Sequence, residues 1–421
     1  MRYTDTKVLI ISHNPLSRVN NNGKTLASIF EGIPEENLYQ IYLNADRPDT
    51  GRGCHYLQIH EGQMLRSVLH LRNLCCREVE ATPGVVSANR VGGRQSPGHV
   101  KRLVREGLWG LSLWKAGLDR WLADKRFDVV FFMAGDGLFA YDVYRFVMAR
   151  TAAKGCMFFT DDYVIGKPSR SPAAALRRGL LKRRIRRTLP LVRELYVISD
   201  EMREAYEALF GVRGYVIRNF SVERRETEAP RGDASDGLTI VYAGGLHYNR
   251  WQVLSQIGRA LHQINQRSPV PGRLKVYSAQ RLGDEIVASL SVEGACEFCG
   301  GVSAAEIADV YGGADILLHV ESFDRKAMAS TCYSFSTKIP EYLSAGRCVM
   351  AVGPASVASI RYLSGCACTV SDPADLPAQL ERLLRDGDCR AAIRARCRAR
   401  YERDFSPESR EACLRRILSG E

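Results

Sequence analysis

Short apolar runs alternate with helix-like segments along almost the whole chain, and this alternation constrains the fold most. Continuous apolar runs of this length are typical of parallel strands that are buried on both faces. The predicted strands are 7–12, 38–43, 128–133, 156–160, 194–198 and 214–218 in the first half, then 238–243, 273–278, 295–299, 314–320 and 348–352. The pattern predicts doubly wound α/β architecture, and 421 residues suffice for two such domains.

A polar stretch that carries glycine and proline, 222–237, separates the two sets of strands and is the predicted linker. We therefore expect an N-terminal domain over 1–221 and a second domain over 238–400, with a C-terminal helix over 401–421. In open α/β sheets, ligands bind at the carboxyl ends of the strands.

The segment 334–346 carries the strongest functional signal. Ser336 and Thr337 are favourable N-cap residues before a short helix that lies between two predicted strands. Free N–H groups, two hydroxyls and Lys338 at a helix start favour phosphate binding. Glu341, one turn further on, could accept two hydrogen bonds from a ribose diol. Together these residues predict a sugar-nucleotide pocket.

This segment resembles the donor-site helix of retaining GT-B glycosyltransferases of the family 4-like group. That group carries two glutamates separated by seven residues, and Glu341 occupies the second position. The first would fall at Tyr333, where this chain departs from the pattern. Glu321 in the preceding loop is the expected substitute as a contact to the donor sugar, and a solvated loop acid is the alternative. The resemblance is strongest over 238–353. It implies a GT-B fold of two Rossmann-like domains, an active site in the cleft between them, and a last helix that returns to the N-terminal domain.

The strand 238–243 ends in Gly244 and Gly245, which permit close approach of the backbone. In the resembling enzymes an arginine and then a lysine follow this strand. Here Gly245 replaces the arginine and Arg250 occupies the place of the lysine. Arg250 can clamp diphosphate oxygens bidentately, and with Lys338 it would stabilise the departing diphosphate. The alternative is a surface arginine beside a glycine turn.

Phe298 and Gly300 lie where the resembling enzymes hold the nucleotide base, largely through backbone groups. The expected substrate is therefore a nucleoside-diphosphate sugar, with UDP or GDP as the nucleotide. No cofactor and no metal are expected, since GT-B enzymes generally need no metal for chemistry. Cys296 and Cys299 form a lone C-x-x-C without a second ligand pair, which favours buried cysteine over zinc.

Three places in the first domain stand out as candidate sites: the Asn22–Gly23 pair, Asp136 and Asp162. Asn22 and Gly23 are expected in a flexible turn that faces the donor phosphates or the acceptor, as in the first loop of the resembling glycosyltransferases. A P-loop is a poor alternative because its earlier glycine would fall on Arg18. Asp136 and Asp162 follow strands and could position an acceptor hydroxyl or exchange a proton, while acidic helix caps are the alternative.

The net charge of +12 favours anionic partners. A basic segment, 176–189, is predicted to be an amphipathic helix that binds a membrane surface. Its alternative is a helix whose apolar residues pack on the core. The expected apolar stripe is Leu176, Leu180, Leu181, Ile185 and Leu189, and the expected basic face is Arg177, Arg178, Lys182, Arg183, Arg184, Arg186 and Arg187.

The chain has no apolar run of eighteen residues and begins without a signal-peptide pattern. Its thirteen cysteines are an odd number scattered over a long chain, which fits reduced thiols. We expect a cytoplasmic protein, with peripheral attachment to the inner face of the membrane as a further expectation.

The resulting hypothesis is a glycosyltransferase that moves a sugar from a nucleoside diphosphate to a hydroxyl of a glycan or lipid-linked acceptor. Retention is implied by the resemblance, as is a role in bacterial polysaccharide or glycolipid synthesis. One alternative is a sugar-nucleotide epimerase on the same fold. Another is a basic nucleic-acid-binding protein, although no nucleic-acid module is recognisable and no nucleic acid is expected. A dehydrogenase is disfavoured because G-x-G-x-x-G follows neither domain's first strand.

Overall fold

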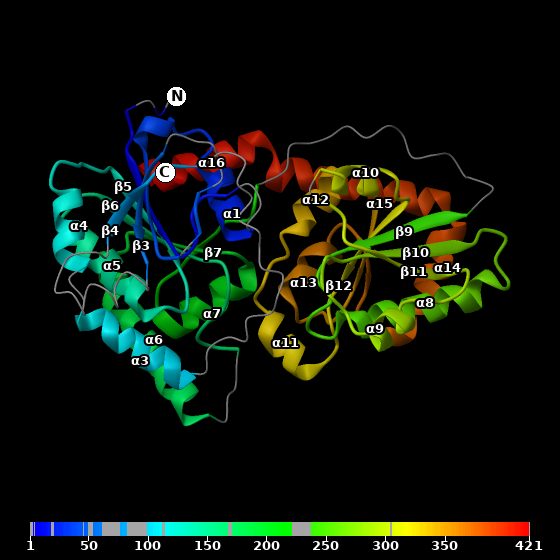
Figure 1. Cartoon of the computed structure of the whole chain (residues 1–421). Coiled ribbons are helices and arrows are strands. Elements are labelled where there is room, and N and C mark those ends of the chain that lie inside the picture. The colour runs from blue at the N-terminus through cyan, green and yellow to red at the C-terminus, as the bar shows by residue number, and fades with distance from the viewer. Residues whose placement is uncertain are drawn as a thin grey trace. The chain divides into compact units, whose positions relative to one another are not determined.

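The computed structural model describes residues 3, 5–17, 21–44, 46–48, 54–60, 76–81, 99–111, 114–166, 171–220, 237–303 and 305–420. The chain forms two compact units (Figure 1). Unit 1 comprises Met1–Asn219 and Arg410–Glu421, and unit 2 comprises Phe220–Ser409. All of the predicted linker except Gly237 lies outside the described residues.

Unit 1 contains an eight-stranded sheet in the order β4-β3-β2-β1-β5-β6-β7-β8. All neighbouring strands are parallel except β3 and β4. The six strands predicted for this half are confirmed, whereas β3 and β4 were not predicted. The strands are β1 (Val8–Ser12), β2 (Leu38–Tyr42), β3 (His55–Ile59), β4 (Cys76–Val79), β5 (Val129–Ala134), β6 (Lys154–Phe159), β7 (Glu194–Val197) and β8 (Tyr215–Val216).

Helices connect these strands, and α7 shows the expected chemistry of caps at both ends. Ser199 accepts a 3.2 Å hydrogen bond from the backbone N–H of Met202 at the start of α7, and Gly211 ends that helix with φ of 72°. The helical segments are α1 (Asn21–Ile29), η1 (Glu35–Asn37), α3 (His99–Leu111), α4 (Trp114–Leu122), α5 (Leu138–Met148), α6 (Pro172–Thr188), η2 (Leu189–Leu191) and α7 (Asp200–Phe210).

The C-terminal helix α16 (Pro407–Ser419) enters unit 1 from Arg410 onward. The Lys154 ammonium donates 3.0 Å hydrogen bonds to the carbonyl oxygens of Arg416 and Ile417 near the end of this helix. A cation at these carbonyls also complements the negative end of the helix dipole. The amino end of β6 therefore holds the last turn of the chain in unit 1.

Unit 2 contains a six-stranded parallel sheet in the order β11-β10-β9-β12-β13-β14. Its five predicted strands are confirmed, and β14 is the addition. The strands are β9 (Leu238–Ala243), β10 (Gly272–Tyr277), β11 (Cys296–Gly300), β12 (Ile316–Val320), β13 (Cys348–Val352) and β14 (Cys368–Val370). The helical segments are α8 (Arg250–Asn265), α9 (Asp284–Ser289), α10 (Ile307–Gly312), α11 (Arg325–Thr331), α12 (Lys338–Ser344), α13 (Ala358–Ser364), η3 (Pro373–Asp375), α14 (Leu376–Arg385) and α15 (Gly387–Phe405).

The strand order of unit 2 reverses between β9 and β12, which are neighbours in the sheet. Such a reversal is the point at which doubly wound sheets bind ligands. The buried Tyr342 on α12 ties this helix to the same place, because its hydroxyl lies 3.3 Å from the backbone nitrogen of Ala243 and 3.5 Å from its carbonyl oxygen. Unit 2 thus brings the end of β9, the end of β12 and the start of α12 together.

Helix α6 corrects the predicted membrane-binding stripe. Leu181 and Ile185 are buried in unit 1, whereas Leu176 is 57% exposed. Arg177, predicted on the basic face, is only 7% exposed and faces inward with them. The predicted stripe is therefore wrong: the domain core occupies part of its apolar side. Among the described residues, no helix is both long and apolar enough to cross a membrane.

Candidate functional site

Two glycines shape the backbone at the end of β9. A Cβ at Gly244 would lie 2.9 Å from the Tyr242 hydroxyl oxygen and 3.2 Å from Cε of Lys338. A Cβ at Gly245 would collide with the His247 ring. The Tyr242 hydroxyl fixes the turn by donating a 2.7 Å hydrogen bond to the carbonyl oxygen of Gly245. Lys338 and His247 therefore approach this backbone closely only because both positions lack a side chain.

The chain then turns sharply into α8. Tyr248 and Asn249 have φ of 60° and 59°, two consecutive non-glycine residues in the left-handed region. This conformation costs roughly 1–2 kcal/mol per residue for most side chains, although asparagine tolerates it better. Strained backbone of this kind is concentrated at functional sites. The turn sets Arg250 as the first residue of α8, beside the end of β9.

Arg250 pairs with Glu321, the residue that follows β12. Arg250 Nη2 lies 3.0 Å from Oε1 and 2.9 Å from Oε2 of Glu321, and Nε lies 3.3 Å from Oε2. The Glu321 side chain is only 4% exposed, and that of Arg250 is 16% exposed. The structure thus brings these two predicted donor-site residues together, but in contact with each other.

Both partners of this pair stay charged. Burial raises the pKa of Glu321, but the His319 ring and the Arg250 guanidinium outweigh burial and hold that pKa below its ordinary value. The His319 Nε2 atom lies 3.5 Å from Glu321 Oε1, and the ring is buried. Burial lowers the pKa of Arg250, and the Glu321 carboxylate more than compensates, so the net shift is upward.

His247 belongs to the same group of side chains and was not predicted. Its Nε2 atom lies 3.4 Å from Arg250 Nη1. Burial, followed by the charges of Arg250 and Lys338, lowers its pKa, so the imidazole is neutral at pH 7. The signal available in the sequence was its position between the glycine pair and Arg250. That Lys338 and Arg250 share a pocket for the diphosphate stays a prediction.

Helix α12 begins at Lys338, after Ser336 and Thr337 as predicted, but Thr337 has helical backbone angles and makes no side-chain cap. Ser336 Oγ instead accepts a 3.4 Å hydrogen bond from the Lys338 backbone N–H. Glu341 is half-buried, and the Tyr311 hydroxyl lies 3.3 Å from its Oε2. Of the predicted phosphate and ribose residues, Lys338 and Glu341 therefore lie in a helix of seven residues, and Ser336 and Thr337 immediately precede it.

The predicted base-binding residues lie in the edge strand β11, which is separated from β9 by β10. Gly300 adopts φ of 75°, and its carbonyl oxygen accepts a 2.7 Å hydrogen bond from the Ser278 backbone N–H. Phe298 precedes it in the same strand. Within the described residues, no group of three or more His, Cys, Asp or Glu could hold a metal ion. Burial raises the pKa of Cys296 to about 12, which keeps it a thiol.

Asn22 and Gly23 lie inside α1, so the predicted flexible turn at these residues is wrong. A Cβ at Gly23 would collide with the carbonyl oxygen of Pro15 and lie 2.7 Å from Ser17 Cβ. The glycine therefore serves close packing of the helix on the segment that follows β1. Residues 18–20, which complete the predicted turn, lie outside the described residues.

Asp136 lies beyond the carboxyl end of β5 in a network of arginines. Its Oδ2 is 2.6 Å from Arg102 Nη1 and 3.4 Å from Arg177 Nη1. Burial raises the pKa of Asp136, but Arg177 and Arg102 outweigh it and lower that pKa overall. Arg177 also pairs with Glu106 at 3.3 Å. Asp136 is thus held as a carboxylate, which suits hydrogen bonding to a hydroxyl and not donation of a proton.

Asp162 makes the contacts of a structural turn. Its Oδ1 accepts 3.0 Å hydrogen bonds from the backbone N–H groups of Val164 and Ile165, and a 3.2 Å bond from the Tyr206 hydroxyl. Its Oδ2 accepts from the Gly166 N–H. Both oxygens bond within the turn, which is not part of a helix, so Asp162 is not the acidic helix cap of the alternative interpretation either. Our proposal assigns Asp162 no catalytic role.

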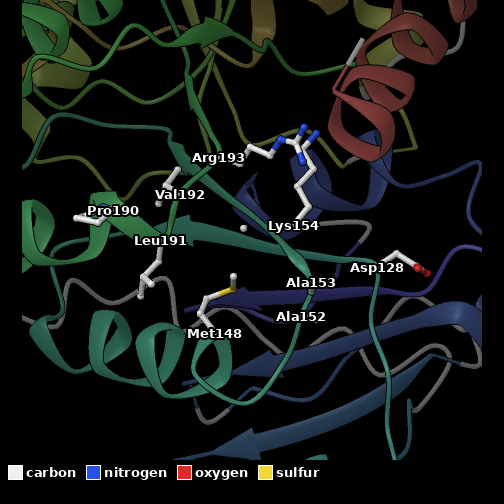
Figure 2. A pocket seen from close by; sticks show the side chains of 10 residues that line it. Asp128, Met148, Ala152, Ala153, Lys154, Pro190, Leu191, Val192 and Arg193 are labelled. Atoms are coloured by element: carbon white, nitrogen blue, oxygen red, sulfur yellow. The ribbon is translucent and has the colours of Figure 1, made fainter.

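A surface cavity of about 460 Å³ lies elsewhere in unit 1 (Figure 2). Met148 and Leu191 line it, with Lys154 at the start of β6 and Arg193 just before β7. It is therefore at the amino ends of the strands, opposite the edge that carries Asp136. Lys154 already pairs with Glu194 at 2.9 Å and with the carbonyls of α16, so this cavity is not assigned to the donor site.

Comparisons with known proteins bear on part of unit 2 and on the fold of the chain. Residues 253–418 match the family model described as Glycosyl transferase-like. A comparison with curated protein sequences finds no match.

Several solved structures are similar over nearly the whole chain. Anabaena Alr3699/HepE in complex with UDP has a TM-score of 0.64 at 14% identity, covering 99% of this chain and 100% of that chain. The N-terminal domain of Candida albicans trehalose-6-phosphate phosphatase has a TM-score of 0.63 at 11% identity, with coverages of 99% and 97%. The α,α-trehalose 6-phosphate synthase of Burkholderia multivorans has a TM-score of 0.58 at 11% identity, covering 99% of this chain and 97% of that chain.

The fold is thus that of the GT-B glycosyltransferases, with two Rossmann-like α/β domains. Within this chain, the segment that matches the glycosyltransferase-like family model covers most of unit 2. The resemblance predicted from the sequence is confirmed at the level of the fold and of this segment.

Proposed function

We propose that the protein transfers a sugar, with retention, from a UDP-sugar to a hydroxyl acceptor. The observation that carries the proposal is the approach of Lys338 and His247 to the Gly244–Gly245 backbone, with Arg250 beside His247, at the reversal of the unit 2 sheet. Anabaena Alr3699/HepE, which shares the fold, is described in complexes with UDP and with UDP-glucose. UDP is therefore the donor nucleotide that we propose first, ahead of GDP.

The proposed chemistry is electrostatic. A departing nucleoside diphosphate develops negative charge, and fixed cations in a site that partly excludes water stabilise it strongly. Lys338 and Arg250 supply this charge, and the hydroxyls of Ser336 and Thr337 add hydrogen bonds. We assign Glu341 to the ribose diol, since Tyr311 restrains its carboxylate and a carboxylate accepts hydrogen bonds from two hydroxyls.

The base would lie against β11, where Phe298 and the backbone of Gly300 are the candidate contacts. Unit 1 would hold the acceptor, and Asp136 is the candidate to accept a hydrogen bond from its hydroxyl. The proposal includes a hexosyl donor, metal-independent transfer, and a glycan or lipid-linked acceptor in polysaccharide or glycolipid synthesis. In it, the protein acts in the cytoplasm at the inner face of the membrane.

The test combines binding with product analysis. UDP at a hundred times its dissociation constant should stabilise the protein by about 2.7 kcal/mol. Lys338→Ala should lower transfer on the order of a hundred-fold while the protein stays folded. The matched control is Lys275→Ala, a partly exposed lysine on β10. Wild-type turnover by Lys338→Ala would remove the assignment of Lys338 to the diphosphate.

Incubation with UDP-sugar in the absence of acceptor separates transfer from epimerisation. A new UDP-sugar in that mixture would replace the transferase proposal with an epimerase. Absence of any response to UDP or GDP would overturn both.

A further inference from the structure

Glu321 was expected to contact the donor sugar, but its contacts point to a different task. Both carboxylate oxygens lie within 3.3 Å of Arg250 nitrogen atoms. The side chain is 4% exposed, and the buried His319 ring lies 3.5 Å from Oε1. Arg250 and burial thus occupy most of the carboxylate surface that a sugar hydroxyl would need to reach.

The geometry of the pair leaves a defined edge of the arginine for other partners. Nε and Nη2 face Glu321, whereas Nη1 is directed to His247 at 3.4 Å. Unlike a lysine ammonium, a guanidinium is a rigid planar fork, so fixing one edge also fixes the direction of the rest. The left-handed turn at Tyr248 and Asn249 constrains the same side chain from its backbone.

Burying a charge pair has a desolvation cost that its Coulomb attraction often fails to recover. The pair is therefore weak evidence for a contribution to stability. It is better explained by function, because preorganised charge needs no reorganisation when the leaving group departs.

We propose that Glu321, supported by His319, is a positioning residue that orients Arg250 so that its Nη1 edge meets the departing diphosphate. The proposal rests on the transferase function proposed above. It predicts a separation of effects. The carboxylate offsets the charge of Arg250, so that Lys338 supplies most of the attraction for the bound nucleotide. Loss of Glu321 should therefore impair turnover and leave UDP affinity intact.

A double-mutant cycle tests the coupling, using Glu321→Gln, Arg250→Lys and the combined variant. Glu321→Gln keeps the side-chain volume and removes the charge, and Arg250→Lys keeps the charge and removes the fork. Glu321→Gln should lower kcat by about 10- to 100-fold, less than the roughly 100- to 1,000-fold effect of removing a transition-state donor outright, because Arg250 itself remains. Its UDP affinity, measured by calorimetry, should stay within about threefold of wild type or become tighter, because the change leaves the site more positive.

In the Arg250→Lys background, Glu321→Gln should cost less than about threefold further in kcat, since residues that act through one another are not additive. An equal loss in both backgrounds would show that Glu321 acts on substrate directly and would overturn the proposal. A parallel fall in UDP affinity and kcat for Glu321→Gln would overturn it as well.

Two controls keep the outcome interpretable. Glu381→Gln removes one partner of a more exposed ion pair with Arg267 in the same unit and should leave kcat unchanged. If Glu321→Gln does not fold, His319→Gln replaces it in the cycle. His319→Gln should lower kcat in the wild-type background and have little further effect on kcat in the Arg250→Lys background. An additive His319→Gln would equally overturn the proposal.

A readout independent of activity separates this inference from the proposed function. The Arg250 Nε–H should exchange slowly with solvent in 15N NMR of the wild type and quickly in Glu321→Gln. A protein that responds to neither UDP nor GDP but shows this difference would refute the transferase function and retain the positioning of Arg250. A protein that binds UDP without this difference would refute the positioning alone.

Discussion

Removing Arg250 while keeping Glu321 should produce a pH-dependent loss of stability whose size follows from burial. In Arg250→Met the side-chain volume is nearly kept, but the Glu321 carboxylate, 4% exposed, loses its cationic partner. Breaking a buried pair in this way typically destabilises by about 3–5 kcal/mol. The variant can limit that loss of stability by protonating Glu321. The cost of this protonation, which sets the largest possible loss, depends on pH.

The magnitude follows from the cost of protonating a carboxyl with an ordinary pKa of about 4.3, at about 1.36 kcal/mol per pH unit. Protonation then costs about 4.4 kcal/mol at pH 7.5 and about 1.6 kcal/mol at pH 5.5. The variant should therefore regain up to about 2.7 kcal/mol between these values. In the folded variant the pKa of Glu321 is raised above its value in the unfolded chain. The stability of the variant is therefore greatest below the unfolded pKa and falls as the pH rises.

The wild type should show no such dependence from this residue, because its Glu321 pKa is lowered and its contribution changes only at more acidic pH. The assay is thermal unfolding of the full chain at the two pH values, taken as the difference between variant and wild type. For a unit of 150–250 residues, about 2.7 kcal/mol corresponds to a change of roughly 6–11 °C in Tm.

The control is Arg250→Met combined with Glu321→Gln, in which the titrating carboxyl is gone and the deficit in Tm should be the same at both pH values. A deficit of Arg250→Met that does not shrink at pH 5.5 would refute the reasoning. It would mean that the carboxylate finds another partner or water once the arginine is removed.

Three further outcomes are expected. Glu341→Gln should weaken UDP binding in calorimetry, since an amide accepts less well than a carboxylate from two ribose hydroxyls; unchanged affinity would leave Glu341 with a role in helix packing beside Tyr311. Gly244→Val should lower the rate of transfer on the order of a hundred-fold while near-UV circular dichroism stays native. The valine side chain would displace Lys338, whose Cε lies 3.2 Å from the Cβ position, and an active variant would contradict this packing. Exchanging the exposed Arg186 and Arg187 of α6 for glutamate should reduce co-sedimentation with anionic vesicles, at roughly 1 kcal/mol per basic residue near such a surface; equal sedimentation of both proteins, or none by the wild type, would exclude α6 as a membrane contact.

Much of the fold was predictable because it depends on local pattern. Buried parallel strands are nearly continuous apolar runs, and eleven of the fourteen strands in the described structure were predicted from them. The missed strands have a weak apolar signal: β3 includes the polar residues His55 and Gln58, β4 has two exposed residues, and β14 has only three residues. Gly346 follows the Ala345 C-cap of α12 with φ of 66°, the left-handed conformation in which helices commonly end at glycine.

Helical periodicity did not identify the buried face of α6. Leu176, Leu181 and Ile185 are equally apolar in the sequence, yet only the last two are buried. Arg177 is buried beside them because Glu106 and Asp136, distant in sequence, offer it partners. The sequence did not show the role of Asp162 either, because that role depends on the turn whose backbone N–H groups bond to its carboxylate.

The sequence by itself determined the two α/β units, the glycine pair after β9, and the set of polar residues at the end of that strand and at the start of α12. Only the tertiary structure decided which of them contact one another. Arg250 and Glu321 are 71 residues apart, and they meet because β9 and β12 are neighbours at the reversal of the sheet. His247 joins them through a left-handed turn that no residue pattern required. The pairing of buried charges depends on which strands lie side by side, and that is a property of the sheet topology as a whole.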